Sequence, residues 1–340
     1  MQNNFSFTFD DVLLVPTYNH QESRRLVDIS STSRCGKLKL ELPIIASNMD
    51  TITEATMANY MAAKGAMGAL HRYCSIDENV QMFQEVKGKV FVSVGTSEAE
   101  LQRVEALRDA GAEYFIIDVA HGHARYVGHA LKRIRQEILR SENYSIMAGN
   151  VATYAGADYL ASCGADLIKV GIGGGSVCST RIKTGFGVPT LSSIQQCARV
   201  DRSIVCDGGV RSPGDVVKAL AFGADFVMMG GMLAGTTPTP GKIHTDENGN
   251  RFKLYRGMAS REAQEDFTGP MSDWKTAEGV STKVPYREDE DAILADIIGG
   301  LRSGLTYGGA NTVQELQRKL DYVIVSAAGK VESLPHKTFQ

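Results

Sequence analysis

The chain has 340 residues, of which 43% are hydrophobic, so it is long enough to bury a large core. Its 36 basic and 39 acidic residues give a formal net charge of −3, which argues against a nucleic-acid-binding face. The first residues lack a basic stretch followed by an apolar run, and the longest apolar runs fall short of the about 20 residues that cross a bilayer. We therefore expect a soluble, cytoplasmic protein that binds neither nucleic acid nor membranes.

Short runs rich in Ile, Val, Phe and Met recur along the chain, each bounded by Gly, Asn or Asp. Nearly continuous apolar runs of this kind are typical of parallel strands that are buried on both faces. Eight such strands are predicted, at residues 43–48, 66–70, 89–95, 114–120, 145–151, 166–173, 203–209 and 225–231.

Helical patterns with apolar residues at three- and four-residue spacing lie between these runs. Three of the predicted helices end alike, with Gly111, Gly164 or Gly223 just before the next strand. The recurrence indicates a repeated strand–helix unit. Eight units predict an α/β fold with a single (β/α)8 TIM barrel spanning residues 1–340, and a doubly wound open sheet is the alternative.

Two segments stand outside this repeat. Residues 1–42 are predicted to cap or flank the barrel. Residues 233–287 form a long region without a regular pattern, and loops of that length are often lids, so we expect a lid or flap after the eighth strand. Helical patterning resumes at 291–310, which is predicted to supply the eighth barrel helix.

Polar and glycine-rich residues gather where the predicted strands end, and this is the face at which TIM barrels carry their active sites. The loops after strands seven and eight often hold phosphate through backbone N–H groups, and here they contain glycine pairs. A phosphate-bearing ligand is one interpretation of these pairs, and ordinary tight turns are the other. The residues at the ends of the predicted strands, including these glycine pairs, are Asn48, Met49, Asp50, Asp118, His121, Asn150, Asp207, Gly208, Gly209, Gly230 and Gly231.

The stretch GIGGGSVCST, residues 171–180, follows the sixth strand. It is not a G-x-G-x-x-G fingerprint, because Ser176 occupies the last position, and no G-K-[ST] follows. It instead places Cys178 at the predicted catalytic rim, with the hydroxyl of Thr180 two residues on as a proton relay. The alternative is a buried cysteine in a tight turn.

The other candidates are weaker. The six cysteines have no C-x-x-C spacing, so neither a zinc site nor disulfides are expected. Lys169 lies in the sixth strand and would suit a Schiff base, but a lysine paired at the barrel end is the stronger interpretation. His121 and His123 have no evident third metal ligand, and Trp274 would cover a planar ligand or simply anchor the lid.

Long motifs in a fixed order resemble the IMP dehydrogenase and GMP reductase family, from FTFDDVLLVP near the start to DYVIVS near the end. They include ASNMDT, IMAGNV, GIGGGSVCSTR, YRGMAS, EGVSTKVPY and GGLRSGLTYGGA. The resemblance implies a barrel, usually a homotetramer, whose loop cysteine attacks C2 of a purine nucleotide to form a covalent thioimidate. Hydride then passes between C2 and a nicotinamide cofactor.

The resemblance also implies roles for individual residues. Cys178 is the nucleophile, and Thr180 and Glu278 relay a proton. The nucleotide is held by Ser176, Asp207, Gly208, Gly209, Gly230, Gly231, Gly257, Met258, Ala259, Lys275 and Gly279. The cofactor is bound by Ser23, Arg24, Asn48, Asp50, Arg72, Asp118, Val119, Ala120, Asn150, Ile172, Gly173, Ser303, Gly304, Leu305 and Thr306. A monovalent cation such as K⁺ lies at Gly173, Gly175, Cys178 and Arg181.

Two features favour the GMP reductase branch, in which GMP and NADPH give IMP and ammonia. No regulatory module of the cystathionine-synthase type is inserted after the second strand, and the lid lacks the Arg-Tyr pair that activates water in IMP dehydrogenases. The chain departs from the family at Gly174, Ser179 and Arg72-Tyr73, where Pro, Thr and Lys-His are usual. An IMP dehydrogenase without its regulatory modules, converting IMP to XMP with NAD, and a non-catalytic purine-nucleotide-binding barrel are the alternatives.

Overall fold

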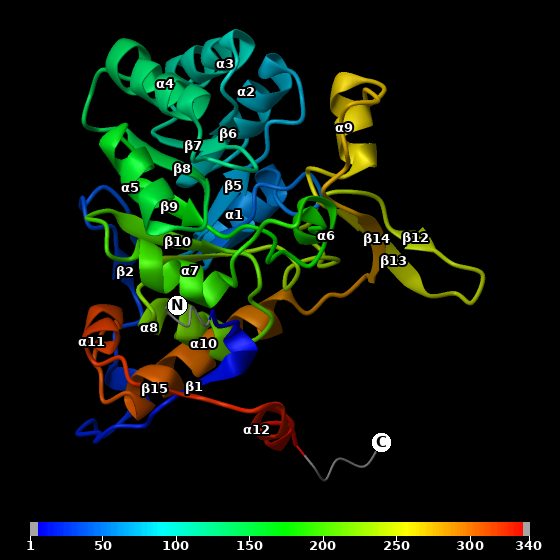
Figure 1. The fold of residues 1–340 in the computed structure, drawn as a ribbon. Helices are drawn as coiled ribbons and strands as arrows, with labels where there is room; N and C mark the ends of the chain where they lie inside the picture. Colours follow the sequence, from blue (N-terminus) through cyan, green and yellow to red (C-terminus); the bar gives the residue numbers. More distant parts are fainter. Residues whose placement is uncertain (1–5, 336–340) are drawn as a thin grey trace.

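A closed barrel of eight parallel strands forms the centre of the computed structural model, which describes residues 6–335. The strands follow one another around the barrel in chain order, and β5 to β10 are labelled in Figure 1. The last strand closes on the first where Val227 pairs with Ile44. The predicted barrel is thus confirmed, and the open-sheet alternative is wrong. The strands are β4 (Ile44–Ala46), β5 (Met67–Leu70), β6 (Val90–Val94), β7 (Tyr114–Asp118), β8 (Ser145–Val151), β9 (Leu167–Val170), β10 (Ser203–Asp207) and β11 (Phe226–Met229).

A ring of helices surrounds the barrel. Several begin at a Ser or Thr whose side chain accepts a hydrogen bond from the third helical residue, as an N-cap does. Gly111, Gly164 and Gly223 have φ of 100°, 107° and 109°, as predicted for residues that end a helix. The helices are α1 (Ala55–Ala63), α2 (Ile76–Gln84), α3 (Glu98–Asp109), α4 (Arg125–Arg133) with the π-helical turn η3 (Ile134–Ile138), α5 (Tyr154–Ser162), α7 (Thr190–Cys197), α8 (Pro213–Ala221) and α10 (Glu290–Tyr307).

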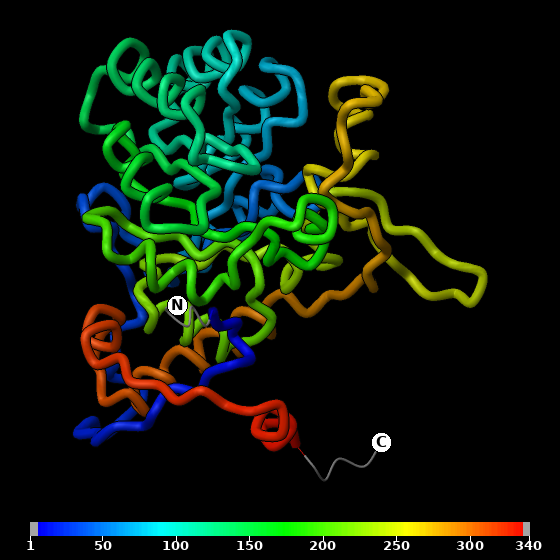
Figure 2. Tube along the Cα trace, in the orientation of Figure 1, coloured from blue at the N-terminus to red at the C-terminus, as the bar shows by residue number. Residues whose placement is uncertain are grey.

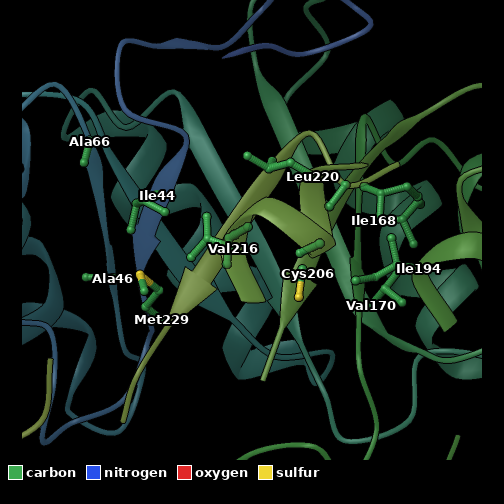
Figure 3. Packing of buried hydrophobic residues seen from close by; sticks show 14 of the residues in the cluster. Ile44, Ala46, Ala66, Ile168, Val170, Ile194, Cys206, Val216, Leu220 and Met229 are labelled. Carbon is green, nitrogen blue, oxygen red and sulfur yellow. The ribbon is translucent and has the colours of Figure 1, made fainter. Parts of the chain in front are cut away.

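The buried side chains form two layers, because successive strand residues point to opposite faces of the sheet. Ile168, Val170 and Cys206 belong to the outer layer, where they pack against the helices (Figure 3). The inner layer fills the barrel and includes Leu167. The same alternation turns Lys169 toward the interior.

A hairpin closes the bottom of the barrel, at the N-terminal ends of the strands. It consists of β2 (Ser31–Thr32) and β3 (Lys39–Leu40), which pair antiparallel. Leu38 and Leu40 of this hairpin are buried in the same cluster as the barrel interior. The hairpin accounts for part of the expected capping role of the N-terminal segment.

The segment between β11 and α10, which we call the lid, is more regular than predicted. It contains a three-stranded antiparallel sheet of β12 (His244–Thr245), β13 (Arg251–Arg256) and β14 (Ser281–Pro285), together with α9 (Arg261–Thr268). The expectation of an irregular region was wrong here, because Asp246 accepts hydrogen bonds from the backbone N–H groups of Asn248 and Asn250 and so builds a hairpin turn. This hairpin projects from the body of the molecule (Figure 2).

The two ends of the described chain meet beside the barrel. The turn η1 (Phe9–Asp11) leads into β1 (Val12–Leu14), which pairs antiparallel with β15 (Tyr322–Ile324). The other elements of these two terminal segments are η2 (Arg24–Leu26), α11 (Val313–Arg318) and α12 (Ala327–Glu332). Within residues 6–335, no helix has the length and apolar character needed to span a membrane. Between β5 and β6 the chain forms only α2 and its short connections.

Candidate active site

A cavity of about 1290 Å³ lies at the C-terminal ends of the barrel strands, beneath the lid. It contains polar and glycine residues from most of the strand ends, as the fold predicts. The predicted site residues that line it are Asn48, Arg72, Asp118, Val119, Ala120, Asn150, Ile172, Gly173, Gly175, Ser176, Cys178, Thr180, Asp207, Gly208, Gly209, Gly230, Gly231, Gly257, Met258, Ala259, Lys275, Glu278 and Gly279.

The glycine run before Cys178 packs closely against the loop that follows β10. Gly171 has φ of 148°, and a Cβ there would lie 2.0 Å from the carbonyl oxygen of Asp207. A Cβ on Gly174 would lie 2.4 Å from the Thr190 hydroxyl. The run is therefore needed to bring two strand-end loops together, and it delivers the half-buried Cys178 to the cavity wall.

Cys178 lies beside the hydroxyl of Thr180, and its loop is bonded to the backbone of Glu278. Its thiol donates to the Thr180 hydroxyl at 3.2 Å, where the short helix α6 (Thr180–Thr184) begins. Ser179 N–H donates to the carbonyl of Glu278 at 2.8 Å, and Val280 N–H donates to the carbonyl of Val177 at 2.9 Å. These backbone bonds fasten the cysteine loop to the lid, so the thiol, the hydroxyl and the Glu278 carboxylate line one cavity.

The glycine pairs after β10 and β11 form a surface of backbone groups and hydroxyls. Gly208 has φ of 89°, and a Cβ there would lie 3.0 Å from the Gly175 nitrogen. A Cβ on Gly231 would lie 2.9 Å from the Ser176 hydroxyl, which shares a 3.1 Å hydrogen bond with Tyr255. Such a surface suits an oxyanion. Tyr255 was missed in the sequence, although it begins the YRGMAS motif.

A charged cluster lies on the barrel axis below this surface. The Lys169 ammonium contacts Asp118 Oδ1 and Asp207 Oδ2, each at 2.9 Å. Asn150 Nδ2 donates to Asp207 Oδ2 and to the Gly171 carbonyl, both at 2.8 Å. This ion pairing confirms the paired-lysine interpretation and argues against a Schiff base, which needs a neutral amine.

The pKa values within this cluster follow from its charges. Burial works to raise the pKa of Asp118, but the charges of Lys169 and Arg72 outweigh it, so that pKa lies below its ordinary value. Burial likewise works to lower the pKa of Lys169, and the two carboxylates outweigh it, so that pKa lies above its ordinary value. Both shifts favour the ionised forms of Asp118 and Lys169.

Two predicted site residues do not line the cavity but contact its walls. Asp50 is held by Arg256, whose Nε lies 2.9 Å away and whose Nη1 contacts Asp266 on α9 at 2.6 Å. Arg181 packs its side chain over Gly173 and donates to the Val188 carbonyl at 2.8 Å. Both side chains thus support loops that border the site.

A second group of predicted cofactor residues lies away from the cavity, on the outer face of the barrel. Ser23 caps η2, and Arg24 donates to the Ser303 hydroxyl on α10 at 3.0 Å. The remaining members, Gly304, Leu305 and Thr306, follow in the same helix, which packs against α8. One copy of the chain therefore does not bring this group and the cavity together.

The remaining candidates gain little support. The rings of His121 and His123 lie 6.4 Å apart, and the part of the chain from 6 to 335 holds no cluster of three or more His, Cys, Asp or Glu that suits a metal ion. All six cysteines are free. Trp274 lines the cavity mouth with 81% of its surface exposed.

The closed barrel, with a cavity at the C-terminal ends of its strands and a thiol on the glycine loop that lines it, defines the class as a (β/α)8-barrel enzyme. The domain family described as "IMP dehydrogenase / GMP reductase domain" matches residues 6–336. This chain belongs to that family.

Individual relatives point to both branches of the family. GMP reductase from Serratia proteamaculans (strain 568) is 37% identical over 96% of each chain. A crystal structure of inosine 5′-monophosphate dehydrogenase from Legionella pneumophila is 68% identical, with a TM-score of 0.88 over 96% of this chain and 100% of that one. A GMP reductase variant from Trypanosoma brucei, solved in complex with guanosine 5′-monophosphate, is 27% identical, with a TM-score of 0.92 over 99% of both chains.

Proposed function

We propose that this chain reduces GMP to IMP with NADPH and releases ammonia. The observation that carries the proposal is the position of the Cys178 thiol, 3.2 Å from the Thr180 hydroxyl and on a loop bonded to the backbone of Glu278. We propose that the carboxylate of Glu278, a residue that lines the same cavity, acts together with this hydroxyl. A nucleophile supported by a hydroxyl and a carboxylate can attack a purine carbon and protonate an amine that leaves it.

In the proposed reaction, the Cys178 sulfur forms a bond to C2 of GMP and gives up its proton. The bond from C2 to the exocyclic nitrogen breaks, and Thr180 and Glu278 pass a proton to the departing ammonia. The resulting thioimidate on Cys178 holds the purine in place. A bound nicotinamide cofactor would supply the hydride that C2 needs. Cys178 then leaves C2 as a thiolate and takes up one proton from solvent, and IMP is released.

The two ends of the cavity suit the two ligands. The glycine pairs at 208–209 and 230–231, with the hydroxyls of Ser176 and Tyr255, would hold the nucleotide phosphate. At the other end Arg72 lines the cavity and carries a positive charge there. This charge would attract an anionic cofactor, and we propose NADPH for this role.

We further propose that a homotetramer completes the cofactor site. The group that contains Arg24 and Ser303 lies outside the cavity of its own chain, so it would reach a cofactor only from a neighbouring copy. Exposed Tyr18, Leu26 and Tyr307 lie beside it and would be covered in such an assembly. The cytoplasmic location stays a prediction from the sequence.

A K⁺ ion at the cysteine loop is also part of the proposal. The expected ligands are carbonyl oxygens, and those of Gly175 and Arg181 each accept one backbone hydrogen bond, from Cys178 and Gly185 at 3.1 Å. A carbonyl oxygen has two lone pairs, so each can still contact a cation. The ion would stiffen the loop that carries the thiol.

The second candidate is an IMP dehydrogenase, which the 68% identical relative favours by its name. That reaction needs a group to activate water. The sequence Tyr286-Arg287 does not suit this task, because the Arg287 guanidinium donates to the Met232 carbonyl and lies 3.5 Å from Asp289. Tyr286 instead packs beneath Arg251, whose guanidinium carbon lies 4.4 Å from the centroid of the tyrosine ring.

A pair of assays decides between these functions. The protein is incubated with GMP and NADPH, and separately with IMP and NAD⁺, while absorbance at the nicotinamide band and free ammonia are followed. We expect NADPH oxidation with equal release of ammonia. Growth of NADH from IMP with no NADPH consumption would establish the dehydrogenase, and nucleotide binding without turnover in either assay would establish a non-catalytic barrel.

A further inference from the structure

Lys169 is a buried cation that the reaction above does not use. It comes from β9, and only 3% of its surface is exposed. Its neighbours Ile168 and Val170 face the helices, so the strand directs Lys169 into the barrel, just below the cavity. Burying an ammonium is costly unless it is paired, and this one is paired twice.

The two carboxylates that it contacts belong to different parts of the site. Asp118 ends β7, at the end of the cavity expected to hold the cofactor, and Asp207 ends β10, beside the glycines expected to hold the nucleotide. We infer that Lys169 is a positioning residue that orients Asp118 and Asp207 together, so that each presents an oxygen to a ligand hydroxyl. This inference rests on the proposed function, because it assumes that both ligands occupy the cavity.

The hydrogen bonds leave acceptors free for this purpose. Lys169 and Asn150 both use Oδ2 of Asp207, so Oδ1 of that carboxylate remains. Lys169 uses Oδ1 of Asp118, and Asn48 is a second donor to that carboxylate, which can accept about four hydrogen bonds and so keeps acceptor capacity. The side chains of Asp118 and Asp207 are 21% and 24% exposed, toward the cavity that both line. Such oxygens are well suited to accept hydrogen bonds from ribose hydroxyls.

Loss of the ammonium would change the charge balance as well as the geometry. Two carboxylates without a cation between them disfavour each other's ionisation, so one pKa rises. The other charged or titratable groups near the pair are Arg72 and Tyr73 near Asp118, and Cys206 and Tyr255 near Asp207, while Asn48 and Asn150 are neutral donors. Arg72 would compensate Asp118 only in part.

The test compares Lys169→Met, Lys169→Arg and a control, Lys37→Met, which removes a lysine paired with Asp166 at the far end of the barrel. Calorimetry measures the binding of GMP and of NADP⁺ to each protein between pH 5.5 and 8.5. We expect Lys169→Met to weaken both ligands by about 10-fold or more at pH 7, the loss expected when charged hydrogen bonds are misaligned. The loss should grow as pH falls, and Lys169→Arg should recover part of it.

Several outcomes would overturn the inference. Weakening of one ligand only would show a local contact, and a lower melting temperature with unchanged binding and an unchanged pH profile would show a purely structural role. Should Lys169→Met fail to fold, Lys169→Arg serves in its place, because it keeps the charge but changes its geometry between the two carboxylates. Weaker binding of both ligands then supports the inference, and weaker binding of one ligand or of neither overturns it. Since binding is measured without turnover, these results are independent of which reaction the enzyme catalyses.

Discussion

Buried charges are neutralised by two partners of opposite sign at both ends of the barrel, but the sign of the central charge differs. At the top, one ammonium, Lys169, lies between two carboxylates. At the bottom, one carboxylate, Asp166, lies between two cations, with Lys37 at 2.9 Å and Arg135 in direct contact. Asp166 also accepts the backbone N–H of Ile146 at 2.9 Å.

The two ends differ in how many carboxylate oxygens remain free to accept a hydrogen bond from a ligand. The bottom carboxylate has two cations and an N–H group on its two oxygens, so it offers little to a ligand. The top carboxylates keep oxygens directed to a cavity. The sequence Gly-Ala-Asp occurs twice at the bottom of the barrel, at 164–166 and 223–225, each time between a helix and the next strand. Its aspartate makes the same contact in both places: Asp166 accepts the backbone N–H of Ile146 at 2.9 Å, and Asp225 accepts that of Ile204 at 2.8 Å. The comparison assigns catalysis to the top and stability to the bottom.

The strongest test of the top is Cys178→Ala. Turnover should fall by about 10⁴-fold or more, since the covalent step is removed, while GMP binding by calorimetry and the melting temperature stay close to wild type. Cys74→Ala is the matched control, because this thiol is half-buried in a separate groove and should leave kcat unchanged. Residual turnover above a hundredth of wild type in Cys178→Ala would refute the nucleophile assignment.

Glu278→Gln should have the next largest effect at the top. We expect kcat to fall by about 10²- to 10³-fold, because the amide cannot supply a proton to the departing amine. The KM for GMP should change little, since the backbone bonds of residue 278 to the cysteine loop are retained. Rapid-quench measurement of ammonia release isolates this step, and a normal burst of ammonia with slow NADPH oxidation would contradict the assignment.

At the bottom, Asp166→Ala should cost stability and spare catalysis. It leaves two cations unpaired and the Ile146 N–H without its acceptor, for a loss of about 3 kcal/mol in the free energy of unfolding. Urea unfolding and kcat/KM measured on the folded fraction check the two halves of the expectation. A fall of 10-fold or more in the kcat/KM of the folded protein would show that the bottom of the barrel also contributes to catalysis.

Asp225→Asn is the mildest test. Burial raises the pKa of Asp225 above 3.8, and Arg34 offsets this only in part. The folded protein therefore binds this proton more tightly than the unfolded chain does, so stability falls as pH rises from the unfolded pKa through the folded one. The Asn variant should lose that slope in urea unfolding between pH 4 and 6, while its oxygen still accepts the Ile204 N–H. An unchanged slope would mean that another group titrates.

The barrel could be predicted from the sequence because its strands are buried on both faces, which leaves apolar runs such as 114–120 unmistakable. The β2–β3 hairpin at the bottom of the barrel could not be predicted, because the apolar residues around Leu38 and Leu40 are few and alternate with lysines. The lid hairpin had a signal, Asn248-Gly249 before an alternating strand, that a search for long apolar runs passes over.

The site was predicted in part. Glycine spacing and family resemblance led to the residues that line the cavity, but spacing along the chain does not say which side chains of neighbouring strands meet. The contact of Lys169 with both Asp118 and Asp207 depends on the relative register of β7, β9 and β10, and the hydrogen bond of Tyr255 with Ser176 depends on where the lid places β13. The position of Arg24 beside α10 likewise requires three dimensions.

Barrel closure also bears on aggregation. A sheet that closes on itself has no edge strands, so β4 to β11 offer no free backbone groups to another chain. The lid sheet does have edges, but β12 has two residues, and β14 carries Lys283 and ends at Pro285. Short strands, lysine and proline all discourage strand addition. A truncation before β11 would expose β4 and β10 instead, and we expect such fragments to aggregate.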